Sequence, residues 1–126
     1  MGWNIEEDGF GVQFSRDIQP FVRSVLSAAT DRFLTGVNKT LKSIDQFILH
    51  PGGAKAMDDF EDAFDIPSQG FEDARSILRE FGNMSAATVL FVLERCLAQS
   101  PPGRRLLGAL GPGFTAEFVI LDSARL

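Results

Sequence analysis

The stretch from Met84 to Ala98 carries apolar and small side chains around nearly the whole circumference of a helix. A surface helix shows one apolar stripe, whereas a helix that is apolar all round is enclosed by protein. The run is shorter than the roughly 20 apolar residues of a membrane span, and it is interrupted by Thr88, Glu94 and Arg95. We therefore predict one central buried helix and no membrane span.

Elsewhere the pattern alternates between short apolar runs and apolar residues at helical spacing. An acidic turn containing Gly9 separates the first two runs and predicts a hairpin. The predicted strands are 3–5, 11–14, 44–49, 105–110 and 115–121, and the other predicted helices are 18–36, 54–64 and 71–80. Together these elements predict an α/β fold, a mixed β-sheet covered by helices.

Helical spacing also predicts which side chains face inward. The expected inward residues are Ile18, Phe21, Val22, Val25, Leu26, Ala29 and Phe33 in the first helix, Met57, Phe60 and Phe64 in the second, and Ala74, Ile77, Leu78 and Phe81 in the third. Three acids of the second helix, Asp58, Asp59 and Asp62, could suggest a metal site. Because no His or Cys joins them, we expect a solvated face and no metal.

Composition narrows the class of protein. A length of 126 residues suits one domain, although half of a larger, internally repeated fold stays open. The net charge of −5 and the absence of a dense basic patch argue against a nucleic-acid partner. The single Cys excludes an intrachain disulfide framework, and the first residues lack a signal core, so we expect a cytoplasmic protein.

Two polar residues are candidates for chemistry. His50 follows a predicted strand and Asn83 precedes the central helix, and α/β folds place ligands at strand ends and helix N-termini. On residue type alone, a lone His before Pro is more often an ordinary loop residue. An Asn before a helix is usually an N-cap.

The neighbouring residues change this interpretation. The motifs 50–53 (His-Pro-Gly-Gly), 82–85 (Gly-Asn-Met-Ser) and 111–114 (Gly-Pro-Gly-Phe), in this order and spacing, resemble the C-terminal half of type III polyketide synthases, the chalcone and stilbene synthase family. The resemblance covers essentially the whole chain. It implies a thiolase-like fold of two similar halves, in which residues 1–126 form the second half and the Cys-bearing N-terminal half is absent.

The resemblance also implies the chemistry. In that family a Cys thiolate of the first half attacks an acyl-CoA thioester. The residues matching His50 and Asn83 are then catalytic, because they polarise the thioester carbonyl and hold malonyl-CoA while it loses carbon dioxide. An enolate and then a tetrahedral oxyanion develop on the same oxygen, and preorganised N–H donors stabilise that charge. Coenzyme A thioesters are thus the implied substrates, with no cofactor and no metal.

Further positions are implied to bind substrate. Lys55 matches a position near the coenzyme A tunnel, although a surface lysine is the simpler interpretation. The 111–114 loop would form part of the wall of the polyketide cavity, which is compatible with an ordinary turn. The implied substrate-binding residues are Gly52, Gly53, Lys55, Gly111, Pro112, Gly113 and Phe114. Cys96 lies deep in the apolar helix and is expected to be a buried hydrophobe, not the nucleophile.

Three hypotheses follow. The first is a catalytic half that is inactive without its Cys-bearing partner half. The second is half of a fatty-acid-type ketoacyl synthase, which also uses a His and an Asn. The third is a non-catalytic module that binds another thiolase-like subunit. Without its sister half the chain should expose an apolar docking face, so we expect self-association or a homodimer.

Overall fold

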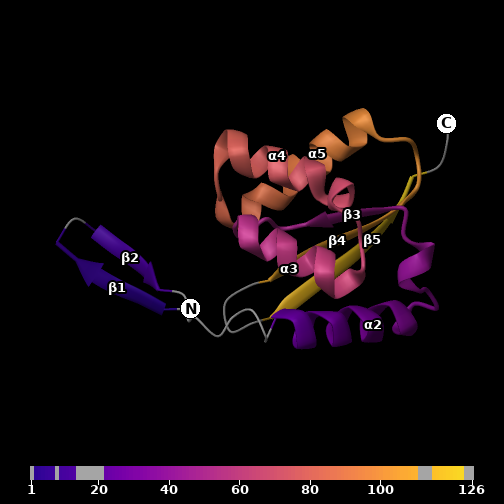
Figure 1. Cartoon of the computed structure of the whole chain (residues 1–126), viewed down its shortest axis with the longest axis horizontal. Coiled ribbons are helices and arrows are strands. Elements are labelled where there is room, and N and C mark those ends of the chain that lie inside the picture. The colour runs from indigo at the N-terminus through magenta and orange to yellow at the C-terminus, as the bar shows by residue number, and fades with distance from the viewer. Residues whose placement is uncertain (1, 8, 14–21, 111–114, 124–126) are drawn as a thin grey trace.

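The computed structural model describes residues 2–7, 9–13, 22–110 and 115–123 (Figure 1). The chain begins with a hairpin of β1 (Gly2–Glu6) and β2 (Gly9–Gln13), antiparallel, with Trp3 opposite Val12. These two strands pair only with each other, and the hairpin lies apart from the other elements in Figure 1. The predicted hairpin is confirmed, while Phe14 lies outside the described residues.

The central sheet has three strands, β3 (Gln46–Leu49), β4 (Arg104–Leu110) and β5 (Ala116–Asp122), in the order β3-β4-β5. β3 runs parallel to β4, and β4 runs antiparallel to β5. The predicted mixed sheet is therefore confirmed, although its first strand begins at Gln46 and not at residue 44.

Within the described residues, four α-helices accompany the sheet: α2 (Ser27–Gly36), α3 (Ala54–Phe64), α4 (Glu72–Phe81) and α5 (Thr88–Gln99). A π-helical turn, Val22–Leu26, leads into α2. Single 3-10 turns occupy Leu41–Ser43, Ser68–Phe71 and Ser85–Ala87. The last of these explains why α5 begins at Thr88 and not at Met84. No helix in the described part of the chain is both long enough and apolar enough to cross a bilayer.

Helices cover both faces of the sheet. Successive residues of a strand point to opposite faces, so each strand contacts helices on both sides. On one face, Phe118 of β5 meets Phe33 of α2 with ring centroids 5.4 Å apart, and Phe47 of β3 stacks on Phe64 of α3 at 6.2 Å. On the other face, Cys96 of α5 contacts β3 and β4. The main core lies between these layers. Its buried residues are Leu26, Ile48, Leu49, Met57, Phe60, Phe64, Phe71, Ala74, Ile77, Val92 and Cys96.

The inward residues of the first helix were predicted only in part. Leu26 is buried and Phe33 is partly buried, as predicted, whereas Val25 is 38% exposed. Thr30 and Leu34 are also buried, and Leu34 packs with Ile44 and Leu106 in a second small cluster. The predicted positions Ile18 and Phe21 lie outside the described residues.

The predicted solvated face of α3 is only partly correct. Asp59 is 7% exposed. The start of α2 packs on α3, where Ser27 Oγ donates to the Ala63 carbonyl at 3.4 Å. Asp58 is solvated and pairs with Arg75 of α4 at 2.7 Å. Within the described ranges, no three His, Cys, Asp or Glu side chains gather as metal ligands.

The central helix α5 is buried on one face only. Its buried residues are Thr88, Val92 and Cys96, whereas Leu90 is 60% and Leu97 53% exposed. The prediction of burial around the whole circumference is therefore wrong for this chain. Its reason is that α4 and the sheet cover about half of α5, and no other described element lies over the rest.

Phe81 was predicted to face inward and is 51% exposed. Its ring lies against that of Phe91, which is 38% exposed, with centroids 5.7 Å apart. The two rings extend the exposed apolar surface from α5 onto the end of α4. We call the surface formed by Phe81, Leu90, Phe91 and Leu97 the α5 face.

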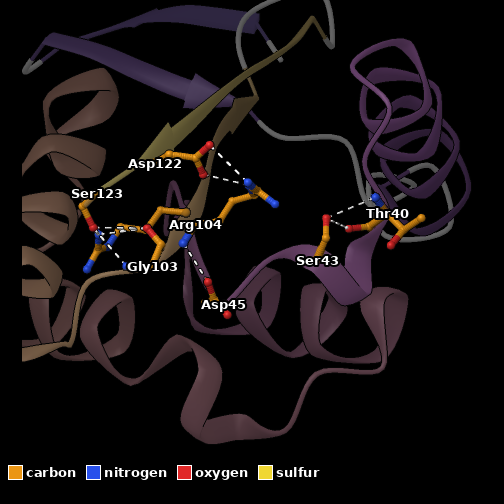
Figure 2. Close-up of polar contacts among 8 residues, drawn as sticks. Thr40, Ser43, Asp45, Gly103, Arg104, Asp122 and Ser123 are labelled. Carbon is orange, nitrogen blue, oxygen red and sulfur yellow. Dashed lines mark hydrogen bonds and ion pairs between the residues drawn. The ribbon is translucent and has the colours of Figure 1, made fainter. Parts of the chain in front are cut away.

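Polar contacts join the ends of the three strands opposite His50 (Figure 2). The Arg104 N–H donates to Asp45 Oδ2 at 2.7 Å, and the Asp45 N–H donates to the Arg104 carbonyl at 2.9 Å. The Arg104 guanidinium pairs with Asp122 at 2.7 Å, which raises the pKa of Arg104 and lowers that of Asp122 through their hydrogen bond. These contacts fix the pairing of β3, β4 and β5 at this end of the sheet.

Arg105, the next residue, is 1% exposed. Its guanidinium donates to the carbonyls of Pro101 and Gly103, to Ser123 Oγ and to Cys96 Sγ. The Cys96 thiol in turn donates to Gln46 Oε1 at 3.3 Å. One buried cation thus holds the loop before β4, the end of β5 and the inner face of α5 together.

Replacing Arg105 with Met should lower the free energy of unfolding by about 2 kcal/mol, because it removes a buried guanidinium that hydrogen-bonds four acceptors. Urea denaturation measures the change. Arg104→Met is the matched control: it removes a solvent-exposed ion pair on the same strand and should have a much smaller effect. Equal effects of the two substitutions would contradict this role for Arg105.

Candidate active site

His50 lies immediately after β3. Its N–H donates to the Gly108 carbonyl at 2.9 Å, which extends the β3–β4 ladder by one bond. Its carbonyl accepts from the Gly52 N–H at 3.0 Å, and Pro51 is buried. The backbone of His50 is therefore held on both sides, and the predicted position at a strand end is confirmed.

The imidazole of His50 is half-buried, and its Nδ1 is buried without a hydrogen-bond partner in the described part of the chain. Burial disfavours the charged form, and desolvation accordingly lowers the pKa of His50 from its usual 6.5. The ring is thus predominantly neutral at pH 7. Because Nδ1 is enclosed, Nε2 is the nitrogen through which His50 can reach a ligand.

Asn83 lies in the connection between α4 and α5. Gly82, with φ +71°, makes the turn out of α4, a conformation that residues with a Cβ rarely adopt. The Met84 N–H donates to Thr88 Oγ1 at 2.8 Å, so Thr88 supplies an acceptor from within the first turn of α5. These contacts fix the backbone on both sides of Asn83.

The carboxamide of Asn83 is itself oriented. Its Oδ1 accepts from the Ser85 N–H at 2.8 Å, and its Nδ2 donates to the Gly52 carbonyl at 3.1 Å. An N–H on one side and a carbonyl on the other leave only one orientation of the amide. The side chain is exposed, so its second N–H is available to a ligand.

The bond from Asn83 to Gly52 joins two connections that are 31 residues apart in sequence. It brings Asn83 against the loop that begins at His50. The predicted pair therefore lies in one region, at the end of β3 and beside the start of α5. An imidazole and a carboxamide are both N–H donors that can stabilise charge on a ligand oxygen without losing a proton.

The other predicted site residues are distributed unevenly. Gly52 is exposed and contacts Asn83, and Gly53 directly precedes α3. Lys55 is exposed in the first turn of α3. Gly111, Pro112, Gly113 and Phe114 lie outside the described residues.

Cys96 is 3% exposed, as expected of a small buried hydrophobe. No cation was predicted beside it, yet Arg105 Nε lies 3.4 Å from its Sγ. Its enclosed position between α5 and the sheet, away from the Asn83 connection, does not suit a nucleophile. Two residues that do support the site, Thr88 and Gly108, were not identified from the sequence.

The lowered pKa of His50 predicts a pH dependence of stability. Between about pH 6.5 and the lower pKa of the folded chain, the unfolded chain binds a proton that the folded chain does not. The free energy of unfolding should therefore fall as the pH falls through this window. His50→Gln should remove this component, since His50 is the only histidine of the sequence.

Urea midpoints measured from pH 7.5 to pH 5 in the two chains test this expectation. Both chains carry the same carboxylates, so the difference between them isolates the imidazole. Identical pH profiles would mean that the fold does not disfavour the charged form of His50.

Comparison with known proteins adds the family context. Residues 1–125 match the family described as chalcone and stilbene synthases, C-terminal domain. A candidate chalcone synthase of Bacillus subtilis (strain 168) is 38% identical over 125 residues, which are 97% of this chain and 34% of that protein. The 1,3,6,8-tetrahydroxynaphthalene synthase of Streptomyces peucetius subsp. caesius is 36% identical over 124 residues, 96% of this chain and 33% of that protein. The chain thus spans about a third of the length of these relatives.

Solved structures show the same fold. PKS-I from the brown alga Ectocarpus siliculosus superposes with a TM-score of 0.85 at 24% identity, over 98% of this chain and 35% of that one. The 1,3,6,8-tetrahydroxynaphthalene synthase of Streptomyces coelicolor A3(2), a bacterial type III polyketide synthase, superposes with a TM-score of 0.84 at 25% identity. This match covers 98% of this chain and 36% of that one. The fold is therefore thiolase-like. By the match over residues 1–125, the chain belongs to the chalcone and stilbene synthase family, of which it carries the C-terminal domain.

Proposed function

We propose that this chain supplies the hydrogen-bond donors for decarboxylative condensation of malonyl-CoA onto an acyl thioester. His50 and Asn83 are the catalytic residues in this proposal. The observation that carries it is the bond from Asn83 Nδ2 to the Gly52 carbonyl, because it gathers both donors at one loop. Family membership supports the reaction class, since a relative is a tetrahydroxynaphthalene synthase.

In the first step, the bond between the carboxylate carbon and the methylene carbon of malonyl-CoA breaks. Carbon dioxide leaves, and the electron pair forms a thioester enolate. The enolate oxygen accepts hydrogen bonds from His50 Nε2–H and from the free N–H of Asn83. A neutral imidazole suits this role, because it donates without transferring its proton.

In the second step, the enolate carbon attacks an acyl group held as a thioester on a Cys. This attack forms the carbon–carbon bond and a tetrahedral oxyanion, which then collapses, breaks the carbon–sulfur bond and releases the Cys thiolate. That Cys is proposed to come from the N-terminal half, since Cys96 is buried away from Asn83. The chain alone should therefore have no turnover.

The remaining predicted residues belong to this proposal as substrate contacts. Gly52 and Gly53 form the loop beside the thioester, and Lys55 is the second residue of the adjoining helix, where it would meet the coenzyme A phosphates. The 111–114 loop is proposed as a wall of the cavity in which the polyketide grows. A cytoplasmic location and the absence of a cofactor also stay predictions.

The test combines this chain with a Cys-bearing N-terminal half and malonyl-CoA. His50→Ala and Asn83→Ala should each lower kcat by about 10²- to 10³-fold, the usual loss for one oxyanion donor. Release of labelled carbon dioxide and formation of product are measured separately. Gln99→Ala, an exposed change at the far end of α5, is the control and should leave both rates unchanged.

Product formed equally well by both alanine variants would contradict the assigned roles. If the two halves still assemble in that case, the chain is a non-catalytic interaction module. The exposed α5 face is the observation that favours this second function.

The α5 face is the surface on which we propose that the N-terminal half docks. Leu90 and Leu97, two turns apart on one side of α5, are each more than half exposed. Exposed apolar surface of this kind marks an interaction site on a protein. Some two thirds of the relatives' length is absent from this chain, enough for a partner half.

Without that half, the chain should self-associate through the same face. Light scattering should give a mass above the 13.8 kDa of one chain, and Leu90→Lys combined with Leu97→Lys should restore the monomer without loss of helix content. A folded wild-type chain that stays monomeric at high concentration would argue against a vacant docking face.

A further inference from the structure

Gly108 of β4 occupies a special place beside His50. It pairs with Leu49 on the parallel side and with Phe118 on the antiparallel side, and its carbonyl accepts the His50 N–H at 2.9 Å. Gly108 is therefore the last partner of β3 before the chain turns into the His50 loop. It is buried, so whatever occupies this position meets other side chains and not water.

The space above Gly108 is already taken by its two neighbours. A Cβ added at Gly108 would lie 2.7 Å from Leu49 Cδ2 and 3.1 Å from two ring carbons of Phe118. Both distances are shorter than ordinary van der Waals contact, so a side chain here would displace Leu49, the residue bonded to His50. The missing side chain lets Leu49 and Phe118 close over the strand.

A cavity of about 10 Å³ adjoins this place. Such a volume is about that of one water-sized sphere. Its lining is apolar apart from His50, and consists of Leu26, Leu49, His50, Phe60, Gly108, Ala109, Leu110 and Phe118. Because Leu49 lines this cavity, a displaced Leu49 side chain can move into it.

Among the described residues, no Lys, Arg, Asp or Glu lines this cavity. On α3, Lys55, Asp58 and Asp62 are exposed and Asp59 is buried, yet only Phe60 reaches the lining. On β5, Glu117 is exposed while its neighbour Phe118 lines the cavity. The described residues that line the cavity with His50 therefore surround it by apolar packing.

We propose that Gly108 is a positioning residue for His50: its carbonyl anchors the His50 backbone, and its missing side chain lets Leu49 and Phe118 hold the imidazole in one orientation. This inference rests on the proposed role of His50 and adds a residue outside the three sequence motifs. Gly108 acts through the β3–β4 pairing and touches no substrate.

The single histidine makes the test direct, because every imidazole signal belongs to His50. In the isolated chain, ¹⁵N-labelled NMR reports the tautomer of the ring and its titration midpoint. The wild-type chain should show a neutral ring with hydrogen on Nε2 and a midpoint below the ordinary value of about 6.5. Gly108→Ala should shift the ring signals and raise the midpoint toward that value, because a displaced ring is better hydrated.

Two further variants separate positioning from general damage. Leu49→Val removes the methyl group that a Cβ would meet, so the double variant Gly108→Ala with Leu49→Val should restore the wild-type signals and keep the chain folded. Leu106→Val shortens a fully buried residue on the same strand, within the cluster of Leu34 and Ile44. It should lower the urea midpoint and leave the His50 signals unchanged.

The inference is overturned if Gly108→Ala leaves the His50 signals as in the wild type. It is also overturned if Leu106→Val changes them equally, or if the double variant fails to restore them. The NMR and urea measurements do not require an active enzyme. A normal turnover rate for His50→Ala in the assembled enzyme would instead contradict the proposed catalytic role of His50. It would not affect the NMR evidence that Gly108 positions the imidazole.

Discussion

The hydrogen bond from Asn83 to the Gly52 carbonyl is the interaction on which the candidate site depends. It spans 31 residues of sequence and links the end of β3 to the start of α5. Its geometry requires both connections to be rigid. The His50 loop is rigid because β4 holds its backbone, and the Asn83 turn is rigid because Gly82 and Thr88 define it. The site is thus a product of the sheet and the central helix together.

The same arrangement accounts for the three helices between β3 and β4 and for the buried Arg105. A parallel β3–β4 pair needs a long crossover, and α3, α4 and α5 supply it. Arg105 holds α5 against the sheet at the opposite end from His50, through Cys96 and the carbonyls before β4. On the outer side of α5, Leu90 and Leu97 are exposed to water in this chain, which is unfavourable for apolar side chains. A second half that covered them would remove this unfavourable exposure.

Periodicity predicted most of the fold, because helices and strands repeat with different periods. The α3 range was predicted correctly, and His50 was placed correctly at a strand end. The errors lie where tertiary contacts decide burial. Asp59 is polar yet buried, and Leu90 is apolar yet exposed, since no pattern within a helix shows which neighbours are present. Sequence motifs identified His50 and Asn83. Gly108 and Arg105 act through tertiary contacts, which the spacing of residues along the sequence does not show.

The central claim is that His50 and Asn83 converge on one thioester oxygen. A crystal structure of the complete enzyme with a malonyl-CoA analogue that cannot lose carbon dioxide tests it most directly. The account predicts the thioester oxygen within about 3 Å of both His50 Nε2 and Asn83 Nδ2. An oxygen bound by only one of them, or turned away from both, would contradict it.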